Sequence, residues 1–237
     1  SVHVNGTEVD VNGESGEGTN TLSLPAGVKY DVQTTFADHQ NYTVSITNAT
    51  FDVNKSDIHL EIIINEIIYG NNVTGTINTN VSGTYTLKIA DADSFEVDLN
   101  IGHNTFTREI LLPVATGYHA EVSIAESDNY NAKSAETTFE VDQTGTDFNA
   151  SSSKEEYVYG EDIILEIELP DDATGNVTFR YVDESYIGEI SDVTQIKEFK
   201  MPIVRAYEYS IQARYNGDNN YKPRTQTINF NVVPAVN

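Results

Sequence analysis

Apolar and polar side chains alternate in three similar segments of the chain. The residues on the apolar side, with one threonine among them, are Tyr30, Val32, Thr34 and Phe36; Tyr118, Ala120, Val122 and Ile124; and Tyr207, Tyr209, Ile211, Ala213 and Tyr215. The residues between them, such as Glu121, Glu208 and Gln212, are mostly polar or charged. A period of two with one apolar side predicts a half-buried β-strand in each segment.

A second strand follows each of these segments. A short polar loop ends in Asn-Tyr, and a phenylalanine and a valine then follow at fixed distances, in the sets Tyr42, Phe51, Val53; Tyr130, Phe139, Val141; and Tyr221, Phe230, Val232. The loops are rich in Asp, Asn and Gly, which suit tight turns. The sequence therefore predicts three β-hairpins that repeat one another.

A proline precedes the first tyrosine of each hairpin by five residues, in the pairs Pro25 and Tyr30, Pro113 and Tyr118, and Pro202 and Tyr207. A tyrosine that opens the penultimate strand fits a tyrosine corner, in which the hydroxyl bonds back to the preceding loop. The tyrosines are 88 and 89 residues apart. A repeat of that length has the size of a small domain.

The segments upstream of the hairpins are also rich in β-formers, and each is introduced by Tyr-Gly, at 69–70 and at 159–160. No stretch shows sustained helical periodicity. About seven short strands per roughly 90 residues predict an all-β fold of tandem immunoglobulin-like β-sandwiches. The chain has no Cys and no Trp, so Tyr, Ile, Val and Phe must fill the cores.

We divide the chain into an incomplete module at 1–55 and two complete modules at 56–145 and 146–237. In the complete modules the Tyr-Gly glycine lies 43 and 42 residues before the proline. The corresponding glycine of the first module would fall before Ser1, so this module is expected to lack its first strands. Either the sequence is a fragment of a longer chain, or a neighbouring chain donates the missing strands.

The net charge of −24 is spread over all three modules, as −5, −11 and −8. Such a surface repels nucleic acid and anionic lipid headgroups, and it keeps an array soluble. Calcium binding is an alternative explanation, because carboxylates lie near the linkers and in the hairpin loops: Asp52, Asp57, Asp142, Asp147, Asp128 and Asp218. No segment has the spacing of an EF-hand, so no metal site and no cofactor is assigned.

Eight Asn-X-Ser/Thr sequons favour a secreted, N-glycosylated protein, with an Asn- and Thr-rich composition as the other explanation. The candidate glycosylation sites are Asn5, Asn41, Asn48, Asn54, Asn72, Asn80, Asn149 and Asn176. The absence of cysteine fits either a reducing compartment or a surface protein without disulfides. The longest apolar stretches are only a few residues, so we expect no direct membrane insertion by this segment.

Residues for catalysis do not converge in the sequence. There is no cysteine nucleophile and no phosphate-binding loop, and the five histidines are scattered: His3, His39, His59, His103 and His119. We therefore expect no enzymatic activity. For sugar binding the exposed aromatic candidates are Tyr157, Tyr186 and Tyr215. Tyr186 lies in 183–190, a segment that the other modules lack, and this insertion is either a private ligand site or an ordinary loop.

Four motifs of the third module are distinctive: ATGNVTF at 173–179, Tyr159-Gly160, YNGDNNY at 215–221 and TQTINFNV at 225–232. With these motifs the module resembles the third-group bacterial Ig-like domains that repeat in adhesin-like surface proteins of methanogenic archaea. The second module is similar from Tyr69 to Val141 but has VSGTYTL in place of ATGNVTF, and the first is similar from about Val2 but has the divergent loop FADHQNY. The resemblance implies an extracellular array with an adhesive or cell-envelope role, and it names no ligand.

These observations predict a cell-surface stalk or adhesin segment. Its expected partners are other modules of the parent chain, with a neighbouring copy, a cell-surface protein or a glycan as further candidates and nucleic acid excluded. The first alternative is a filament subunit that a neighbouring chain completes by strand donation, for which the β-prone segment 59–68 is either a donor or its own module's first strand. The second alternative is an accessory module of a secreted carbohydrate-active enzyme.

Overall fold

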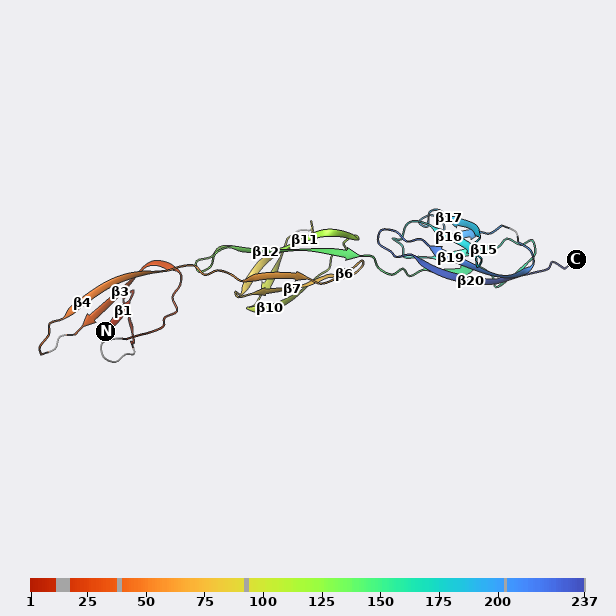
Figure 1. The fold of residues 1–237 in the computed structure, drawn as a ribbon. Helices are drawn as coiled ribbons and strands as arrows, with labels where there is room; N and C mark the ends of the chain where they lie inside the picture. The colour runs from red at the N-terminus through yellow and green to blue at the C-terminus, as the bar shows by residue number, and fades with distance from the viewer. Residues whose placement is uncertain (12–17, 38–39, 92–93, 203, 237) are drawn as a thin grey trace. The chain divides into compact units, whose positions relative to one another are not determined.

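The computed structural model describes residues 1–11, 18–37, 40–91, 94–202 and 204–236. Within these ranges the chain forms strands, turns and loops without a helix, as Figure 1 shows. The residues group into two compact units. The first comprises Ser1–Ile64, Gly75–Phe106 and His119–Thr137, and the second comprises Asn65–Thr74, Thr107–Tyr118 and Thr138–Asn237. Because the boundary between the units passes through 56–145, the division into three modules stays a prediction.

A four-stranded sheet in the order β2-β1-β3-β4 lies in the first unit. Its strands are β1 (Val2–Val4), β2 (Thr7–Val9), β3 (Gly27–Phe36) and β4 (Ser45–Val53). The alternating segment 30–36 forms part of β3, as predicted, and Tyr30 pairs with Phe51 across the hairpin. One face of this sheet is apolar, and it leaves Phe36 55% exposed.

Two further sheets contain the strands between Leu60 and Asp142. The three-stranded sheet has the order β10-β7-β5, with β5 (Leu60–Ile64), β7 (Val73–Thr79) and β10 (Gly102–Arg108). The five-stranded sheet has the order β6-β12-β11-β8-β9, with β6 (Ile67–Ile68), β8 (Gly83–Ile89), β9 (Phe95–Leu99), β11 (Ala115–Ile124) and β12 (Lys133–Asp142). The segment 59–68 therefore contributes a strand to each sheet rather than a single first strand.

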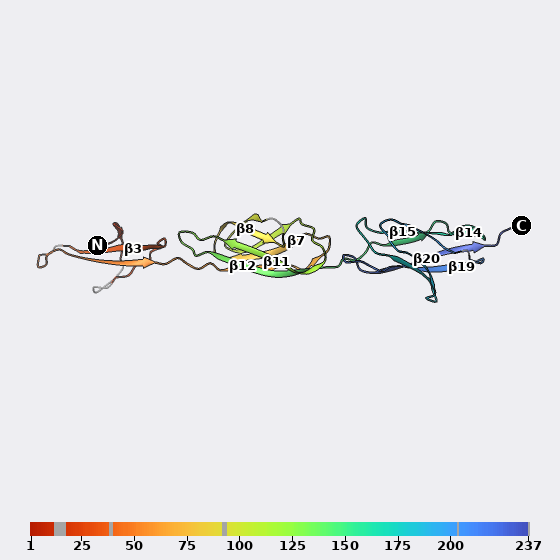
Figure 2. The same cartoon turned by 90° about the horizontal axis from the view of Figure 1, so that it is seen from above.

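The last two sheets lie in the second unit and repeat the strand arrangement of the previous two. Figure 2 draws their strands in teal to blue. The three-stranded sheet, in the order β13-β15-β18, contains β13 (Asn149–Ser152), β15 (Ile164–Glu168) and β18 (Glu198–Lys200). The five-stranded sheet, in the order β14-β20-β19-β16-β17, contains β14 (Glu156–Val158), β16 (Val177–Tyr181), β17 (Tyr186–Ile190), β19 (Tyr207–Tyr215) and β20 (Arg224–Val233).

Both five-stranded sheets have the same parallel edge strand. Their first strand pairs in parallel with their last, at Ile67 with Val141 and at Tyr157 with Val232. The Tyr-Gly motif forms the turn that ends this first strand, because Gly70 and Gly160 have φ angles of 89° and 98°. A positive φ at the third turn position is readily adopted only by glycine. Two sheets with this strand order form an immunoglobulin-like sandwich, so the predicted fold class is confirmed.

Tyr and Phe share the core of the C-terminal sandwich with Ile, Val and other aliphatic residues, as the absence of Cys and Trp predicted. The largest fully buried side chains there are Tyr157, Phe179 and Tyr215. The prediction that Tyr157 and Tyr215 are partly exposed is therefore wrong, since their exposed fractions are 1% and 0%. Both rings can be buried because their hydroxyls are hydrogen-bonded: Tyr157 to Ser152 Oγ at 2.8 Å, and Tyr215 to the Thr174 carbonyl at 2.9 Å.

The predicted tyrosine corners form at two of the three positions. The hydroxyl of Tyr30 donates to the Pro25 carbonyl at 2.8 Å, and that of Tyr118 donates to the Pro113 carbonyl at 2.9 Å. In both hairpins the tyrosine ring also stacks on the phenylalanine of the next strand, at centroid distances of 5.5 and 5.4 Å. The corner thus joins the start of one strand to the loop before it, and the ring stack joins this strand to the next strand of the hairpin.

The third corner is made by Tyr209, and the assignment of Tyr207 to it is wrong. Tyr209 donates to the Arg205 carbonyl at 3.0 Å and stacks on Phe230 at 5.5 Å. The physical reason is strand register, since Tyr209 pairs with Phe230 across the hairpin whereas Tyr207 pairs with Val232. Tyr207 lies one pleat beyond the corner, where its side chain is 62% exposed.

Candidate functional site

Two of the three Asn-Tyr motifs bind the segment that precedes their hairpin in the array. In the first unit Asn129 Oδ1 accepts from the Ala26 amide at 2.9 Å, and in the second unit Asn220 Oδ1 accepts from the Val114 amide at 3.2 Å. Each donor follows a proline of the repeat. The tyrosine after each asparagine forms a parallel bridge, at Ser56 with Tyr130 and at Thr144 with Tyr221. The sequence repeat therefore encodes a repeated junction, which the spacing alone did not reveal.

In the second unit two tyrosines share one carboxylate. The hydroxyl of Tyr69 donates to Asp172 Oδ2, and that of Tyr221 donates to Asp172 Oδ1, both at 2.7 Å. The two rings meet edge to face at 5.6 Å. The hydrogen bond from Tyr69 and that from Tyr221 hold the pKa of Asp172 below its usual value. Asp172 thus favours the charged state in which it accepts both bonds.

Asp218, a candidate ligand in the alternative of calcium binding, caps the hairpin loop. Its Oδ1 accepts from the Asn220 and Tyr221 amides, and its Oδ2 accepts from the amide and hydroxyl of Thr174, at 2.8 to 3.0 Å. Burial would raise the pKa of Asp218, but the hydrogen bonds from these amides lower it below its usual value. Because its two oxygens accept four hydrogen bonds, this carboxylate stabilises the loop conformation.

Other predicted calcium ligands are similarly engaged. Asp52 accepts from the Lys29 amide at 2.7 Å, and Asp57 accepts from the Asn131 side chain at 2.9 Å. Among the described residues no group of three or more His, Asp or Glu side chains could hold a metal ion. Asp128, Asp142 and Asp147 are exposed. His39 lies outside the described residues, and the other four histidines form no such group.

Most of the candidate glycosylation sites lie on the surface. The exposed asparagines are Asn5, Asn41, Asn48, Asn54, Asn72, Asn80 and Asn149, whereas Asn176 is half-buried. Asn176 Oδ1 also accepts from the Asn216 side chain at 3.0 Å. Modification of these residues stays a prediction, with Asn176 the least accessible of the eight.

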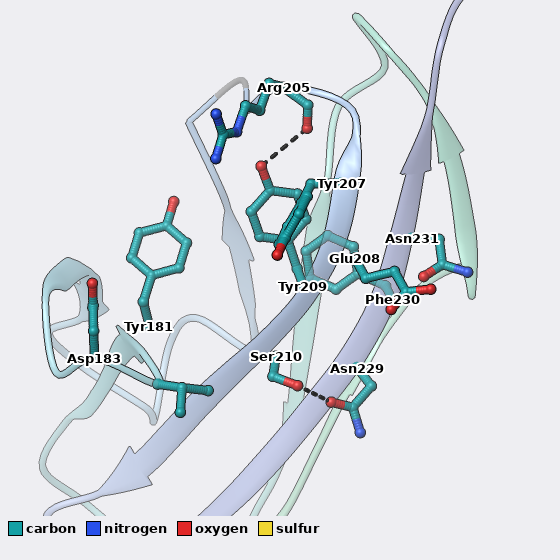
Figure 3. Close-up of a pocket in the computed structure, with 11 residues that line it drawn as sticks. Tyr181, Asp183, Arg205, Tyr207, Glu208, Tyr209, Ser210, Asn229, Phe230 and Asn231 are labelled. Carbon is teal, nitrogen blue, oxygen red and sulfur yellow. Dashed lines mark hydrogen bonds between the residues drawn. The ribbon is translucent and has the colours of Figure 1, made fainter.

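A cavity of about 630 Å³ opens at the end of the C-terminal sandwich where β19 begins. Figure 3 shows Tyr181 and Asp183 on one side and Tyr207, Tyr209 and Glu208 on the other. Tyr207 and Tyr209 meet edge to face at 5.9 Å, and Tyr181 and Tyr209 are 6.3 Å apart. Burial raises the pKa of Tyr181, and so do the neighbouring Tyr209 and Asp183, so its hydroxyl stays protonated at neutral pH.

The charged groups of this cavity form no ion pair with one another. The guanidinium of Arg205 lies over the Tyr207 ring, 5.5 Å from its centroid, and makes no salt bridge with a described residue. Asp183 Oδ1 accepts from the amide and the hydroxyl of Ser185, which lower the pKa of Asp183. Sequence reasoning missed Arg205 and Tyr207 as site residues, although two tyrosines at 207 and 209 on one strand face were the available signal.

The insertion at 183–190 was the first sequence candidate for a ligand site, and it borders this cavity only through Asp183. Its residues 186–190 form β17, which pairs with β16 across a bulge at Phe179 and Arg180. Tyr186 is 56% exposed, and the Arg180 guanidinium lies 5.7 Å from its ring centroid. The strand β17 has the same position in its sheet as β9 has in the other five-stranded sheet, so the expectation that the other modules lack this segment is wrong. Only Asp183 of the segment lines the cavity.

Neither a protein-family model nor a curated protein sequence matches this chain. Among solved structures, it is similar to the fibronectin(III)-like modules of CbhA from Clostridium thermocellum, with 12% identity over 73% of this chain and 95% of that one and a TM-score of 0.31. It is also similar to the four N-terminal Ig domains of Dscam1 isoform 6.9, with 11% identity over 87% of this chain and a TM-score of 0.37. The match spans 54% of that Dscam1 chain.

A third similar structure is the BSP domain of a biofilm-associated protein, with 13% identity, 76% of this chain and 30% of that one covered, and a TM-score of 0.27. These likenesses concern the β-sandwich fold alone, and the fold assignment rests on the strand order described above. Within the described residues no helix is long and apolar enough to cross a lipid bilayer.

Proposed function

We propose that this chain is a non-catalytic segment of an extracellular surface protein, in which Ig-like repeats space and present an adhesive element or contribute to adhesion themselves. The proposal rests on the repeated junction. Asn129 and Asn220 make the same hydrogen bond to the residue after a proline, and the same parallel bridge follows each of them. A joint that recurs with the repeat is the feature that a spacer requires.

The parallel edge pairing in the two five-stranded sheets supports a mechanical role. The first strand of each sandwich pairs in parallel with its last, as β6 with β12 and β14 with β20. When a sandwich is pulled by its two ends, such a parallel pair is loaded along the strands, and its hydrogen bonds must break together. Forced unfolding is governed by the unfolding rate, which this arrangement lowers.

Single-molecule stretching of the chain by its two ends tests the proposal. Each sandwich is expected to unfold in a discrete event that releases a length of order 300 Å, from about 3.3–3.6 Å per extended residue. A variant with proline at Ile67, which breaks the β6–β12 pairing, should lower the force of one event only. Smooth extension without force peaks would contradict a mechanical role.

The remaining parts of the proposal follow from the sequence. The surface sequons and the acidic surface support a secreted location, and the resemblance to third-group Ig-like domains supports an origin in an adhesin-like cell-surface array of a methanogenic archaeon. The charge of −24 opposes binding to nucleic acid. The proposed partners are neighbouring modules of the parent protein and a surface protein or glycan.

A filament subunit is the second candidate function, and the four-stranded sheet favours it. Its order β2-β1-β3-β4 corresponds to the five-stranded sheets without their first, parallel strand, so the edge of β4 is unpaired among the described residues. Phe36 and Phe51 remain exposed on its apolar face, at 55% and 37%. A strand from a neighbouring chain would pair with β4 and cover this face.

Light scattering across a concentration series distinguishes the two candidates. A monomer at all concentrations supports the spacer, and a polymer that grows with concentration supports the filament. If polymers form, Phe36→Asp should prevent them, whereas Ile63→Asp, which changes a half-exposed residue of β5, should not.

A further inference from the structure

We propose that the cavity at the start of β19 binds a short neutral oligosaccharide, with the ring of Tyr207 as its stacking surface. This inference rests on the adhesive part of the proposed function and names the class of glycan that it would bind. Such a site would suit an adhesin. It would also suit an accessory module of a secreted carbohydrate-active enzyme, the second alternative from the sequence.

Tyr207 is available for stacking because Tyr209, and not Tyr207, forms the tyrosine corner. Tyr209 forms the corner bond and the stack on Phe230, which leaves Tyr207 62% exposed. The Tyr207 hydroxyl has no hydrogen-bond partner among the described residues. An exposed aromatic face with a polar tip provides the apolar contact for the C–H face of a pyranose ring and a hydrogen-bonding group for its hydroxyls.

Exposed polar residues line the cavity near this ring. Asp183 uses only Oδ1 for Ser185, and its Oδ2 accepts no hydrogen bond from a described residue. Glu208 and Asn231, which pair with each other on the opposite face of β19 and β20 from Tyr207, also line the cavity, and their side chains likewise have no hydrogen-bond partner within the described ranges. Carboxylates accept hydrogen bonds and amides both donate and accept them, so together they match the hydroxyls of a sugar.

The charge of the cavity selects among sugars. Asp183 and Glu208 supply two negative charges against one positive charge from Arg205, whose guanidinium is held over Tyr207. With the acidic surface around it, this site disfavours uronic or sialic acids. The volume of about 630 Å³ lies within the range of roughly 300–1,000 Å³ of small-molecule sites. A neutral oligosaccharide of a few residues therefore fits best.

The test is an NMR titration of the isotope-labelled chain with cellotetraose, maltotetraose, mannotetraose, fully N-acetylated chitotetraose and a sialylated trisaccharide. At least one neutral tetrasaccharide should shift the signals of Tyr181, Tyr207 and Asn231 saturably at millimolar concentration, and the sialylated one should not. No saturable shift with any neutral sugar, or shifts confined to residues outside the cavity, would overturn the proposal. Preferential binding of the sialylated sugar would overturn it as well.

Three variants separate binding from folding. Tyr207→Ala should weaken the affinity by roughly tenfold or more, and Tyr207→Phe, which keeps the ring, should retain most of it. The control is Tyr159→Ala, because Tyr159 is 52% exposed in the same sandwich and does not line the cavity. Equal losses in Tyr207→Ala and Tyr159→Ala would contradict the assignment. The stretching behaviour is independent of this result, so failure of the sugar site would leave the proposed mechanical role unaffected.

Discussion

The hydroxyl of Tyr209 donates to the carbonyl of Arg205, and this contact decides the roles of both neighbours. It anchors the start of β19 to the preceding loop and positions the Arg205 side chain beside Tyr207. In the two earlier hairpins the corner tyrosine bonds to a proline carbonyl five residues upstream, whereas here the acceptor is four residues upstream. The C-terminal repeat thereby gains an additional tyrosine beyond its corner.

Removal of the corner hydroxyl should destabilise the C-terminal sandwich. Tyr209→Phe is expected to lower its free energy of unfolding by about 0.5–1.5 kcal/mol, the usual net contribution of one hydrogen bond. Tyr207→Phe should change it by less than about 0.5 kcal/mol, because that hydroxyl is exposed and unpaired among the described residues. Urea unfolding followed through NMR signals of β19 measures both, and equal effects would mean that the corner is assigned to the wrong tyrosine.

Removal of either junction asparagine, Asn129 or Asn220, should accelerate the hydrogen exchange of the one amide that bonds to it. In Asn220→Ala the Val114 amide loses its acceptor, and its hydrogen exchange should accelerate by roughly threefold to tenfold, as expected for one hydrogen bond. The Ala26 amide, which bonds to Asn129, is the internal control and should be unaffected. The reciprocal variant Asn129→Ala should accelerate Ala26 exchange alone. Unchanged exchange at both amides would remove the support that the junction gives to the spacer role.

The turn before the Asn-Tyr motif requires glycine at position 217. Gly217 has a φ of 80°, and a Cβ there would lie 2.8 Å from the Tyr221 carbonyl oxygen. Gly217→Ala should therefore lower the free energy of unfolding by about 1–2 kcal/mol or more. Gly145→Ala is the matched control, because a Cβ there meets no atom within 4 Å. Thermal unfolding that is equally affected by the two substitutions would contradict this explanation.

Acid should weaken the Tyr69–Asp172–Tyr221 cluster. The pKa of Asp172 is lowered in the folded state, so its contribution to stability is present above the unfolded value of about 3.9 and is lost as the pH falls through the folded value. Between pH 5 and 3, approximately, the unfolding free energy should fall less steeply in Asp172→Asn than in the unmodified chain. Asp171→Asn is the control, because it removes the neighbouring carboxylate while both tyrosine hydrogen bonds go to Asp172. Parallel pH profiles for the Asp172 variant and the unmodified chain would rule out this linkage.

Several elements could be predicted because they depend on local pattern. The alternation at 118–124 and 207–215 gave the strands, and the Tyr-Gly motifs marked positions where only glycine readily adopts the required turn. The corners at Tyr30 and Tyr118 followed from the Pro–Tyr spacing. The same spacing wrongly predicted a corner at Tyr207, five residues after Pro202. Tyr209 forms the corner instead, because Tyr209 is the residue that pairs with Phe230.

The sequence by itself determined the all-β fold, the repeated hairpins and a core without Cys or Trp, because these depend on periodicity, turn chemistry and composition. Only the tertiary structure showed that Asn129 and Asn220 form junctions, that Asp218 caps a loop, and that Tyr157 is buried while Tyr207 is exposed. These properties depend on contacts between residues distant in the chain. Burial and strand register decide whether a tyrosine lies in a core, closes a corner or faces a cavity, and a period-two pattern is the same in all three cases.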